Sequence, residues 1–300
     1  MLKIAYHPIY RHPLPKGHRF PMEKYELLPQ QLLHEGTCIP TNFFEPTVPN
    51  DKYIVAVHEP EYFYDLLNIK IPAREARKIG FPLTEELVER ERIIADGTMK
   101  GCEFALENGI AMNIAGGTHH AYTDRGEAFC MLNDQAIGAR YLQARNLAEK
   151  ILIVDLDVHQ GNGTAEIFQN DDSVFTFSMH GANNYPFKKE KSDMDIPLKK
   201  GTGDAEYLST LRENLPKLID KTRPDFIFYL CGVDIIETDK LGTLALTLEG
   251  SKQRDETVLE TCHRLNIPVQ CSMGGGYSAD IRTIVEAHAN TFRTAQQLFF

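Results

Sequence analysis

Short runs of β-branched and aromatic residues alternate along the chain with longer stretches in which apolar residues recur every three or four positions. The apolar runs predict strands at residues 111–115, 151–155, 174–178, 226–230 and 267–272. The periodic stretches predict helices at residues 84–107, 134–148, 205–219 and 251–265, and Thr84 is placed to cap the first of them. Strands that alternate with helices at this spacing indicate a parallel sheet with helices on both faces. The first 80 residues, rich in proline, histidine and aromatic residues, are harder to interpret.

The length of the chain and its even composition favour one domain. A chain of 300 residues can bury roughly 75% of the surface that it exposes when unfolded. No Ser/Gly linker, internal repeat or break in composition divides it. We therefore predict a single α/β domain over residues 1–300, with three layers, α/β/α, and a mainly parallel central sheet.

The strand predicted at residues 151–155 leads into an unusual polar segment. Asp155, Asp157 and His159 follow one another at intervals of two residues. Alternate side chains of an extended strand lie on the same face, so these three side chains are predicted to form one row. Burying two carboxylates and an imidazole without a cation or hydrogen bonds would cost several kcal/mol or more. The row therefore requires a binding partner.

Three other predicted strands also end in polar or glycine-rich clusters. The clusters are Gly-Gly-Thr-His-His-Ala at 116–121, Cys-Gly-Val-Asp at 231–234 and Met-Gly-Gly-Gly-Tyr at 273–277. Ligand sites in open parallel sheets lie beyond the carboxyl ends of the strands. All four clusters are therefore expected to meet in one crevice.

The acids and the imidazole of these clusters suit a metal ion. Two carboxylates and one imidazole form a ligand set for zinc or ferrous iron, and a position left open for water would make the site catalytic. We predict that Asp157, His159 and Asp234 are the ligands. Asp155 is better placed to orient a histidine or to help bind a monovalent cation. The competing interpretation is that each acid caps a helix or a turn, and for Asp234 alone the sequence favours neither.

Two further clusters suit the chemistry of hydrolysis. His119 and His120 are adjacent, and a neutral imidazole can take a proton from water while an imidazolium can donate one to a departing amine. Tyr277 can donate a hydrogen bond to an oxyanion that develops opposite the metal. Gly275 and Gly276, directly before it, would let the backbone approach a substrate closely. Buried histidines and glycine turns also have purely structural uses, and it is their position at strand ends that favours the functional interpretation.

Charge and apolar content limit the classes of function. With 32 Lys and Arg against 42 Asp and Glu, the formal net charge is −10, which argues against a general nucleic-acid binder and is compatible with a cationic substrate. No apolar run reaches the length of a membrane span, and the first residues lack the apolar core of a signal peptide, so we expect a cytoplasmic protein. The six cysteines include no CxxC pair and are expected to be reduced thiols.

The polar clusters resemble those of the histone deacetylase family, whose members have the arginase/deacetylase fold. The similarity extends over nearly the whole chain, with the motifs in the family's order and spacing. The matching segments are Gly-Gly-Thr-His-His-Ala at 116–121, Phe-Cys at 129–130, Asp-Leu-Asp-Val-His-Gln-Gly-Asn-Gly at 155–163, Gly-Val-Asp at 232–234, Asp239, Gly-Gly-Gly-Tyr at 274–277, and Val-His at 57–58 with Tyr62. Within the family, Gln160, Asn162 and the Tyr185-Pro186 segment are most similar to the class IV branch and its bacterial relatives.

The resemblance implies roles for individual residues. His120, oriented by Asn162, would be the general base, and His119, partnered by Asp155, the acid or electrostatic partner. One divalent ion, zinc or ferrous iron, would be the catalytic metal. A structural monovalent cation would lie near Asp155 and Ser178.

Two residues depart from the family's usual pattern. Asn162 stands where most members have an aspartate, and an asparagine can orient His120 but should raise its basicity less, because it carries no negative charge. Ala128 stands where the family commonly has glycine, and its methyl group is expected to narrow the wall or to displace a substrate contact. The neighbouring Phe129 still suits a slot for the stem of an acyl-lysine.

The resemblance implies a zinc-dependent hydrolase that removes an acetyl or longer acyl group from a lysine side chain of a protein or peptide. One alternative is a hydrolase of acetylpolyamines or other small acylated amines; an arginase-like site with two metals would need more aspartates and histidines. Another alternative is a binding module for acyl-lysine without catalysis, which the histidine pair and Tyr277 argue against. No direct contact with nucleic acid is expected. The sequence does not give the acyl length or the oligomeric state.

Overall fold

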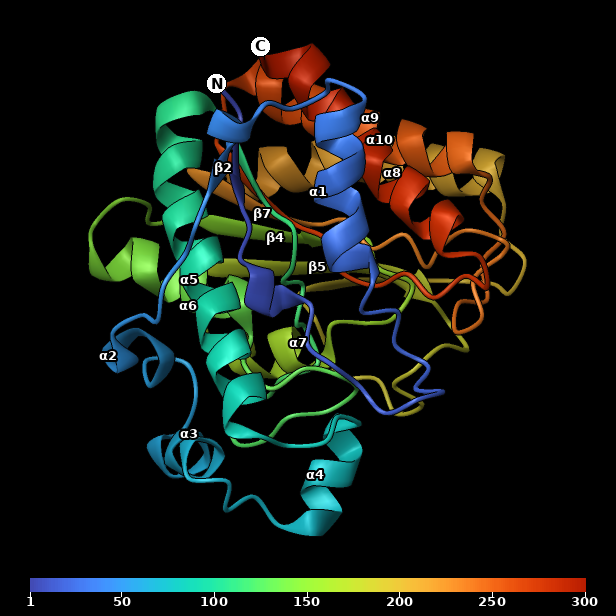
Figure 1. The fold of residues 1–300 in the computed structure, drawn as a ribbon. Helices are drawn as coiled ribbons and strands as arrows, with labels where there is room; N and C mark the ends of the chain where they lie inside the picture. The colour runs from blue at the N-terminus through green and yellow to red at the C-terminus, as the bar shows by residue number, and fades with distance from the viewer.

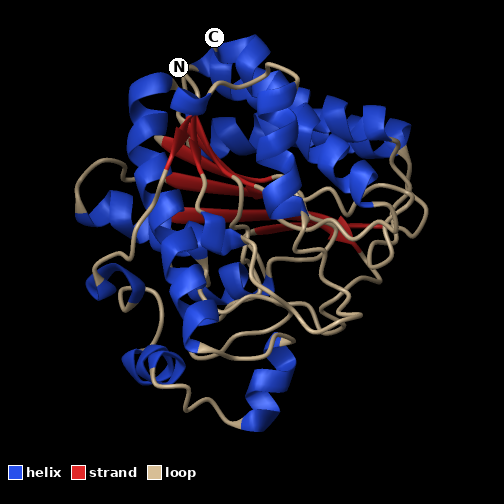
Figure 2. Ribbon diagram, viewed as in Figure 1, coloured by secondary structure: helices blue, strands red, loops and turns tan.

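An eight-stranded parallel sheet runs through the centre of the computed structural model, which describes residues 1–300 (Figure 2). Its strands are β1 (Lys3–Ala5), β2 (Phe43–Phe44), β3 (Ile110–Asn113), β4 (Ile151–Asp155), β5 (Val174–Gly181), β6 (Met194–Leu198), β7 (Phe226–Leu230) and β8 (Val269–Ser272). Their order across the sheet is β2-β1-β3-β8-β7-β4-β5-β6, and every neighbouring pair is parallel. The predicted α/β class and parallel sheet are confirmed.

The chain has ten α-helices, and the longer ones lie against the two faces of this sheet (Figure 1). They are α1 (Lys24–His34), α2 (Asp51–Ile54), α3 (Pro60–Leu67), α4 (Ala73–Ile79), α5 (Glu85–Asn108), α6 (Asp134–Ala144), α7 (Asn162–Phe168), α8 (Asp204–Thr222), α9 (Leu248–Leu265) and α10 (Ile281–Phe299). Helices α1, α8, α9 and α10 pack on one another in one layer, and α5 packs against α6 and strands β1, β3 and β8 in the other. None of the helices combines the length and apolar character that crossing a membrane requires.

Helix α5 shows why the sequence predicted the helices in the middle of the chain accurately. Thr84 caps it, because the Thr84 side chain accepts a hydrogen bond from Leu87 N at 3.1 Å. Gly109 ends it with a φ of 85°, a left-handed conformation that glycine adopts at little cost. The predicted helix at residues 84–107 is therefore confirmed within one residue at each end.

Other predicted boundaries shift where the backbone requires it. Helix α6 ends at Ala144 rather than at residue 148, and Asn146 just beyond it adopts a left-handed φ of 55°. Strand β8 begins at Val269 rather than at residue 267, because Pro268 has no N–H to donate to a neighbouring strand. All six cysteines are free and buried, as expected.

Several elements carry no clear pattern in the sequence. Strands β1 and β2 have three and two residues, too few to show an alternation. Helix α10 buries His288, Thr291 and Thr294 among its apolar residues, which interrupts the helical spacing. Strand β6 contains Pro197, which an edge strand tolerates.

The position of the site follows from the strand order. Strands β3, β8, β7 and β4 are consecutive neighbours in the middle of the sheet. Because they are parallel, their carboxyl ends lie at the same edge, and the four polar clusters that follow them meet there.

Candidate functional site

Asp157, His159 and Asp234 lie together beyond the carboxyl ends of β4 and β7. Their ligand atoms, one from each residue, are all within 4.8 Å of one another, and all three residues are buried. His159 Nδ1 is 3.0 Å from Asp157 Oδ1 and 3.1 Å from Asp234 Oδ2. The structure therefore brings together the three residues predicted to hold a metal.

The donor atoms of this cluster fit a divalent cation. Two carboxylates and one imidazole form a nitrogen and oxygen set suited to zinc or ferrous iron. Burial and the nearby Asp157 raise the pKa of Asp234 to about 7. Burial alone would lower the pKa of His159, but hydrogen bonds to the two carboxylates raise it to about 10. The buried acids thus need positive charge beside them, and a metal ion would supply it.

The glycine turn after β8 supports the two carboxylates. Gly275 N donates a hydrogen bond to Asp157 Oδ2 at 2.9 Å. A Cβ atom at Gly275 would lie 2.0 Å from Asp234 Oδ2, so a side chain cannot be accommodated there. Gly275 also lines the cavity in front of the cluster, whereas Gly276 does not line it, and a Cβ atom at Gly276 would lie 2.7 Å from Val233 Cγ2. Of the two predicted substrate-binding glycines, the structure brings only Gly275 to the cavity.

The predicted row of side chains on an extended strand is wrong in its local geometry. Strand β4 ends at Asp155. Beyond it, Asp157 N donates to Asp155 Oδ1 at 3.1 Å, and His159 N donates to Asp157 Oδ1 at 3.0 Å. Such bonds from a side chain to the backbone two residues further on produce turns rather than extended chain. The three side chains are neighbours because the backbone turns, not because a strand alternates.

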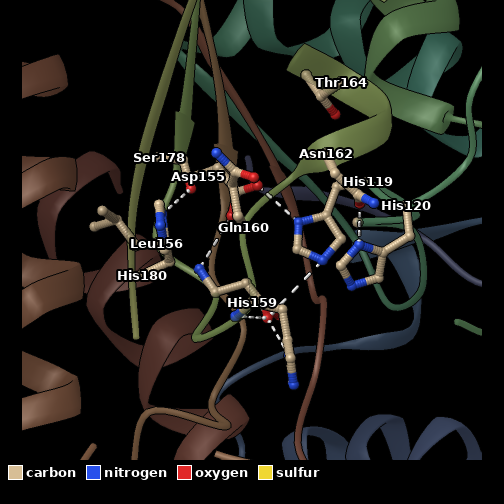
Figure 3. A network of polar contacts seen from close by, with 12 residues as sticks. His119, His120, Asp155, Leu156, His159, Gln160, Asn162, Thr164, Ser178 and His180 are labelled. Carbon is tan, nitrogen blue, oxygen red and sulfur yellow. Dashed lines mark hydrogen bonds and ion pairs between the residues drawn. The ribbon is translucent and has the colours of Figure 1, made fainter. Parts of the chain in front are cut away.

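His119 and His120 stand beside this cluster, each held by a different partner (Figure 3). His119 Nδ1 is 2.7 Å from Asp155 Oδ2, and His120 Nδ1 is 2.5 Å from Asn162 Oδ1. The two imidazole rings have their centroids 4.1 Å apart. His119 Nε2 lies 3.9 Å from Asp157 Oδ1, so its free nitrogen faces the ligand cluster. Both predicted histidine pairings are therefore present in the structure.

The surroundings of the two histidines favour opposite protonation states. Burial alone would lower the pKa of His119, but the charge of Asp155 and its hydrogen bond raise it above the usual value. Burial, together with the charges of His119 and His159, lowers the pKa of His120 well below the usual value. His120 is thus suited to accept a proton at neutral pH, and His119 to hold one.

Tyr277 and aromatic side chains form the walls of a narrow cavity in front of the cluster. The cavity has a volume of about 40 Å³ and is lined by both histidines, Asp157 and His159, together with aromatic residues. The Tyr277 ring lies 5.9 Å from Phe20, 6.2 Å from Phe129 and 6.4 Å from His159, measured between ring centroids. Tyr277 N donates a hydrogen bond to Asp239 Oδ2 at 2.6 Å, and this bond fixes the backbone at Tyr277. Burial raises the pKa of Tyr277 well above its usual value, so its hydroxyl keeps a proton to donate.

An outer groove of about 420 Å³ leads to His120, His159 and Tyr277. Its charged lining residues other than histidine are Arg19 and Lys78, and no carboxylate lines it. The acidic composition of the whole chain is therefore not concentrated at this opening. The net charge of −10 gives no reason to expect a cationic substrate.

Comparison with known proteins agrees with this geometry. A model of the histone deacetylase domain matches residues 18–292. The chain belongs to the histone deacetylase family. This family member is 44% identical over 296 residues to an uncharacterized protein of Picosynechococcus sp., with 99% of each chain covered. It is 28% identical over 288 residues to Histone deacetylase 2 of Arabidopsis thaliana, with 93% of this chain and 74% of the relative covered.

Solved structures share the same fold. The crystal structure of an HDAC homolog complexed with SAHA superimposes on this histone deacetylase-family protein with a TM-score of 0.85, over 99% of this chain and 84% of the other. The two sequences are 22% identical, so this likeness concerns the fold. With the family match, it identifies the protein as a hydrolase of the histone deacetylase family with the arginase/deacetylase fold.

Ala128 departs from the family's usual glycine at a position where the backbone favours glycine. Its φ is 45°, in the left-handed region, which costs a residue with a Cβ roughly 1–2 kcal/mol. We expect Ala128→Gly to raise the free energy of unfolding by at most about 1 kcal/mol, because glycine relieves this strain but also gives the unfolded chain more freedom. Chemical denaturation measures the change.

A matched control for Ala128→Gly is Ala76→Gly, in the middle of α4, where the backbone is helical. This variant is expected to lower the free energy of unfolding by about 1 kcal/mol. If both variants destabilise the deacetylase-family protein equally, the left-handed strain at Ala128 has no energetic effect.

Sequence interpretation missed a buried cation beside the site. Lys24 is fully buried, and its Nζ donates to Gly274 O at 3.0 Å. The same Nζ lies 5.7 Å from the centroid of the Tyr277 ring. Burial lowers the pKa of Lys24 to about 8. A single lysine among the first 80 residues carries no sequence signal, because its burial depends on the packing of α1 against the glycine turn.

Proposed function

We propose that this histone deacetylase-family hydrolase removes an acyl group from the side-chain amine of lysine. The observation that carries the proposal is the convergence of three groups of residues at one cavity. Asp157 and His159 of the buried ligand cluster, a pair of histidines whose pKa values shift in opposite directions, and a protonated tyrosine all line the same space of about 40 Å³. In metal-assisted hydrolysis of an unactivated amide, these three kinds of group supply the activated water, the proton transfers and the stabilisation of the oxyanion.

A divalent ion, which we propose to be zinc, would be held by Asp157, His159 and Asp234. Bound there, it would polarise the amide carbonyl and lower the pKa of water from 15.7 towards about 7. The walls around it consist of Phe20, Phe129 and Tyr277, which limit the access of bulk water. We also propose the predicted monovalent cation near Asp155 and Ser178, which lie opposite each other on β4 and β5.

The two histidines divide the proton transfers between them. His120, neutral and held by Asn162 through Nδ1, takes a proton from the attacking water at Nε2. His119, protonated beside Asp155, stabilises the developing negative charge, and one of the pair then protonates the departing amine. The departing group must leave as a neutral amine, because an amide anion is too basic to be expelled from the tetrahedral intermediate in water.

Tyr277 donates its phenolic proton to the oxyanion that forms when water attacks the carbonyl. We expect Tyr277→Phe to lower kcat by about 10²- to 10³-fold, the usual effect of losing one oxyanion donor. The value of KM and the zinc content should change little, because the hydroxyl acts on charge that develops after binding. Steady-state kinetics with elemental analysis measure these quantities, and a near wild-type kcat would remove Tyr277 from the mechanism.

The proposed substrate is an acetylated lysine in a protein or peptide. Phe129 and Phe20 flank the passage, with ring centroids 5.1 Å apart, and would hold the apolar stem of the lysine. A cavity of about 40 Å³ is small, since a cavity that takes up benzene has about 150 Å³. This volume favours acetyl over octanoyl or myristoyl. Because Gln160 and Asn162 resemble the class IV branch, longer acyl groups are also plausible substrates, and the experiment below includes them.

The experiment that tests this proposal compares acyl groups on one lysine peptide. Zinc-reconstituted protein is assayed with acetyl, octanoyl and myristoyl peptides, with acetylated spermidine beside them and with metal-free protein as the blank. We expect turnover of the acetyl peptide and none in the blank. If the protein hydrolyses acetylated spermidine but none of the lysine peptides, its substrates are acetylpolyamines rather than acyl-lysine peptides. Binding of acyl peptides without any turnover would favour a binding module.

A further inference from the structure

The side chain of Asn162 can in principle face His120 in two ways. In the structure, its Oδ1 is 2.5 Å from His120 Nδ1, and its Nδ2 is 2.8 Å from the hydroxyl of Tyr122 (Figure 3 shows the first contact). Turning the amide by 180° about χ2 would exchange its acceptor and donor ends at almost the same positions. An aspartate has no such ambiguity, because both of its oxygens accept.

The two orientations have opposite consequences for the histidine. With Oδ1 facing it, His120 carries its proton on Nδ1, and Nε2 has a free electron pair. With the amide NH₂ facing it, Nδ1 must accept, and the proton moves to Nε2. Only the first arrangement lets Nε2 of His120 accept a proton from water.

Tyr122 and Glu190 select the first arrangement. The Tyr122 hydroxyl lies 3.3 Å from Glu190 Oε1. A carboxylate only accepts hydrogen bonds, so the single proton of the tyrosine points toward Glu190. The hydroxyl oxygen can then only accept from Asn162, which places Nδ2 toward Tyr122 and Oδ1 toward His120. Burial raises the pKa of Tyr122 to about 12, so the hydroxyl keeps its proton at neutral pH.

Neighbouring side chains hold the ring of Tyr122 and the backbone of Glu190 in place. Tyr122 is 4% exposed, and the Arg125 guanidinium carbon lies 3.5 Å from the centroid of its ring. Gln160 clamps the backbone of Glu190: its Nε2 donates to Glu190 O at 2.8 Å, and its Oε1 accepts from Glu190 N at 2.9 Å. Gln160 belongs to the same segment as His159 and Asn162, so the segment that carries the ligand also positions Glu190.

We propose that Tyr122 and Glu190 are positioning residues that fix the tautomer of His120 by holding the amide of Asn162 in one orientation. The inference rests on the proposed function, in which His120 Nε2 is the base. It explains how an asparagine can serve at position 162. An aspartate would fix the proton of His120 on Nδ1 by its charge, and here a chain of three hydrogen bonds fixes it there.

A double-mutant cycle tests this proposal in the zinc-loaded enzyme with the acetyl-lysine peptide. We expect Tyr122→Phe to lower kcat about tenfold, the equivalent of one lost hydrogen bond, and to leave KM within about twofold. In an Asn162→Asp background, the same substitution should change kcat less than about twofold, because a carboxylate needs no orientation. An equal loss in both backgrounds would mean that Tyr122 is merely structural and would overturn the proposal. Tyr64→Phe, at a side chain 49% exposed on α3, is the matched control and should leave kcat unchanged.

Glu190→Gln provides a second variant at a partly buried position that should fold normally. The glutamine amide can donate to Tyr122, so the tyrosine proton is free to turn toward Asn162 and the amide can reverse. We expect a fall in kcat that Asn162→Asp again suppresses. An unchanged kcat would remove Glu190 from the proposal.

A readout independent of turnover is ¹⁵N NMR of labelled histidine, with the His120 signals assigned by their loss in His120→Asn. We expect the proton on Nδ1 in the wild type and a mixture of both tautomers in Tyr122→Phe and Glu190→Gln. A wild-type proton on Nε2, or a tautomer unaffected by both variants, would overturn the inference. An Nδ1 proton in a protein that hydrolyses no acyl peptide would support the positioning role and overturn the proposed substrate.

Discussion

Asp157→Ala is expected to remove zinc binding and turnover together. Asp157 contributes one of three ligand atoms in the buried cluster, and its other oxygen is held by Gly275 N. Losing a residue outside the ligand set typically costs about 10- to 100-fold in metal affinity, so losing a ligand should cost more than about 100-fold. Elemental analysis after dialysis measures zinc content, and the acetyl-lysine assay measures kcat.

Asp155→Asn is the matched control for this variant. Asp155 is a buried carboxylate two residues away; it pairs with His119 at 2.7 Å and accepts a hydrogen bond from the backbone N of Asp157, but it supplies none of the three ligand atoms. We expect Asp155→Asn to keep stoichiometric zinc while lowering kcat. If Asp157→Ala retains zinc, or if Asp155→Asn loses it as completely, the assignment of Asp157 as a ligand is wrong.

His120→Ala is expected to lower kcat by about 10²- to 10⁴-fold, the usual contribution of a general base. His120 is buried beside the cluster, but none of its hydrogen bonds goes to Asp157, His159 or Asp234. Its removal should therefore leave the zinc content unchanged. Steady-state kinetics together with zinc analysis separate loss of the base from loss of the metal.

His119→Ala is the comparison that separates the two histidines. Its pairing with Asp155 raises the pKa of His119 and favours the protonated form, so the variant should lose charge stabilisation and proton donation rather than proton acceptance. We expect a smaller loss of kcat than for His120→Ala. Turnover that survives His120→Ala but not His119→Ala would reverse the two roles.

The sequence predicted most of the central fold because the central strands are buried on both faces. Strands β4 and β7 coincide with the predicted ranges, and both are unbroken runs of buried residues. The first 80 residues were difficult because their strands are too short to show a period, and three of their helices, α2, α3 and α4, lie at the edge of the molecule. Helix α10 was not predicted because histidine and threonine occupy part of its buried face and interrupt the apolar spacing.

The sequence predicted the members of the candidate site better than their geometry. Ligand types at strand ends indicated Asp157, His159 and Asp234, and the structure places them within 4.8 Å. The alternation argument behind the first two was wrong, because carboxylate-to-backbone bonds turn the chain after β4. Gly276 was expected near the substrate, but it does not line the cavity in front of the cluster.

What the sequence determined by itself is the set of chemical groups and the edge of the sheet where they meet. Residue types at the ends of parallel strands are sufficient for that, because parallel strands share one carboxyl edge. Only the tertiary structure decided the environment of each group. Lys24 is buried beside Tyr277, the pKa values of His119 and His120 shift in opposite directions, and Tyr122 meets Asn162 across 40 positions of sequence. Burial and hydrogen-bond direction depend on which distant segments pack together, and no local pattern in the chain encodes that.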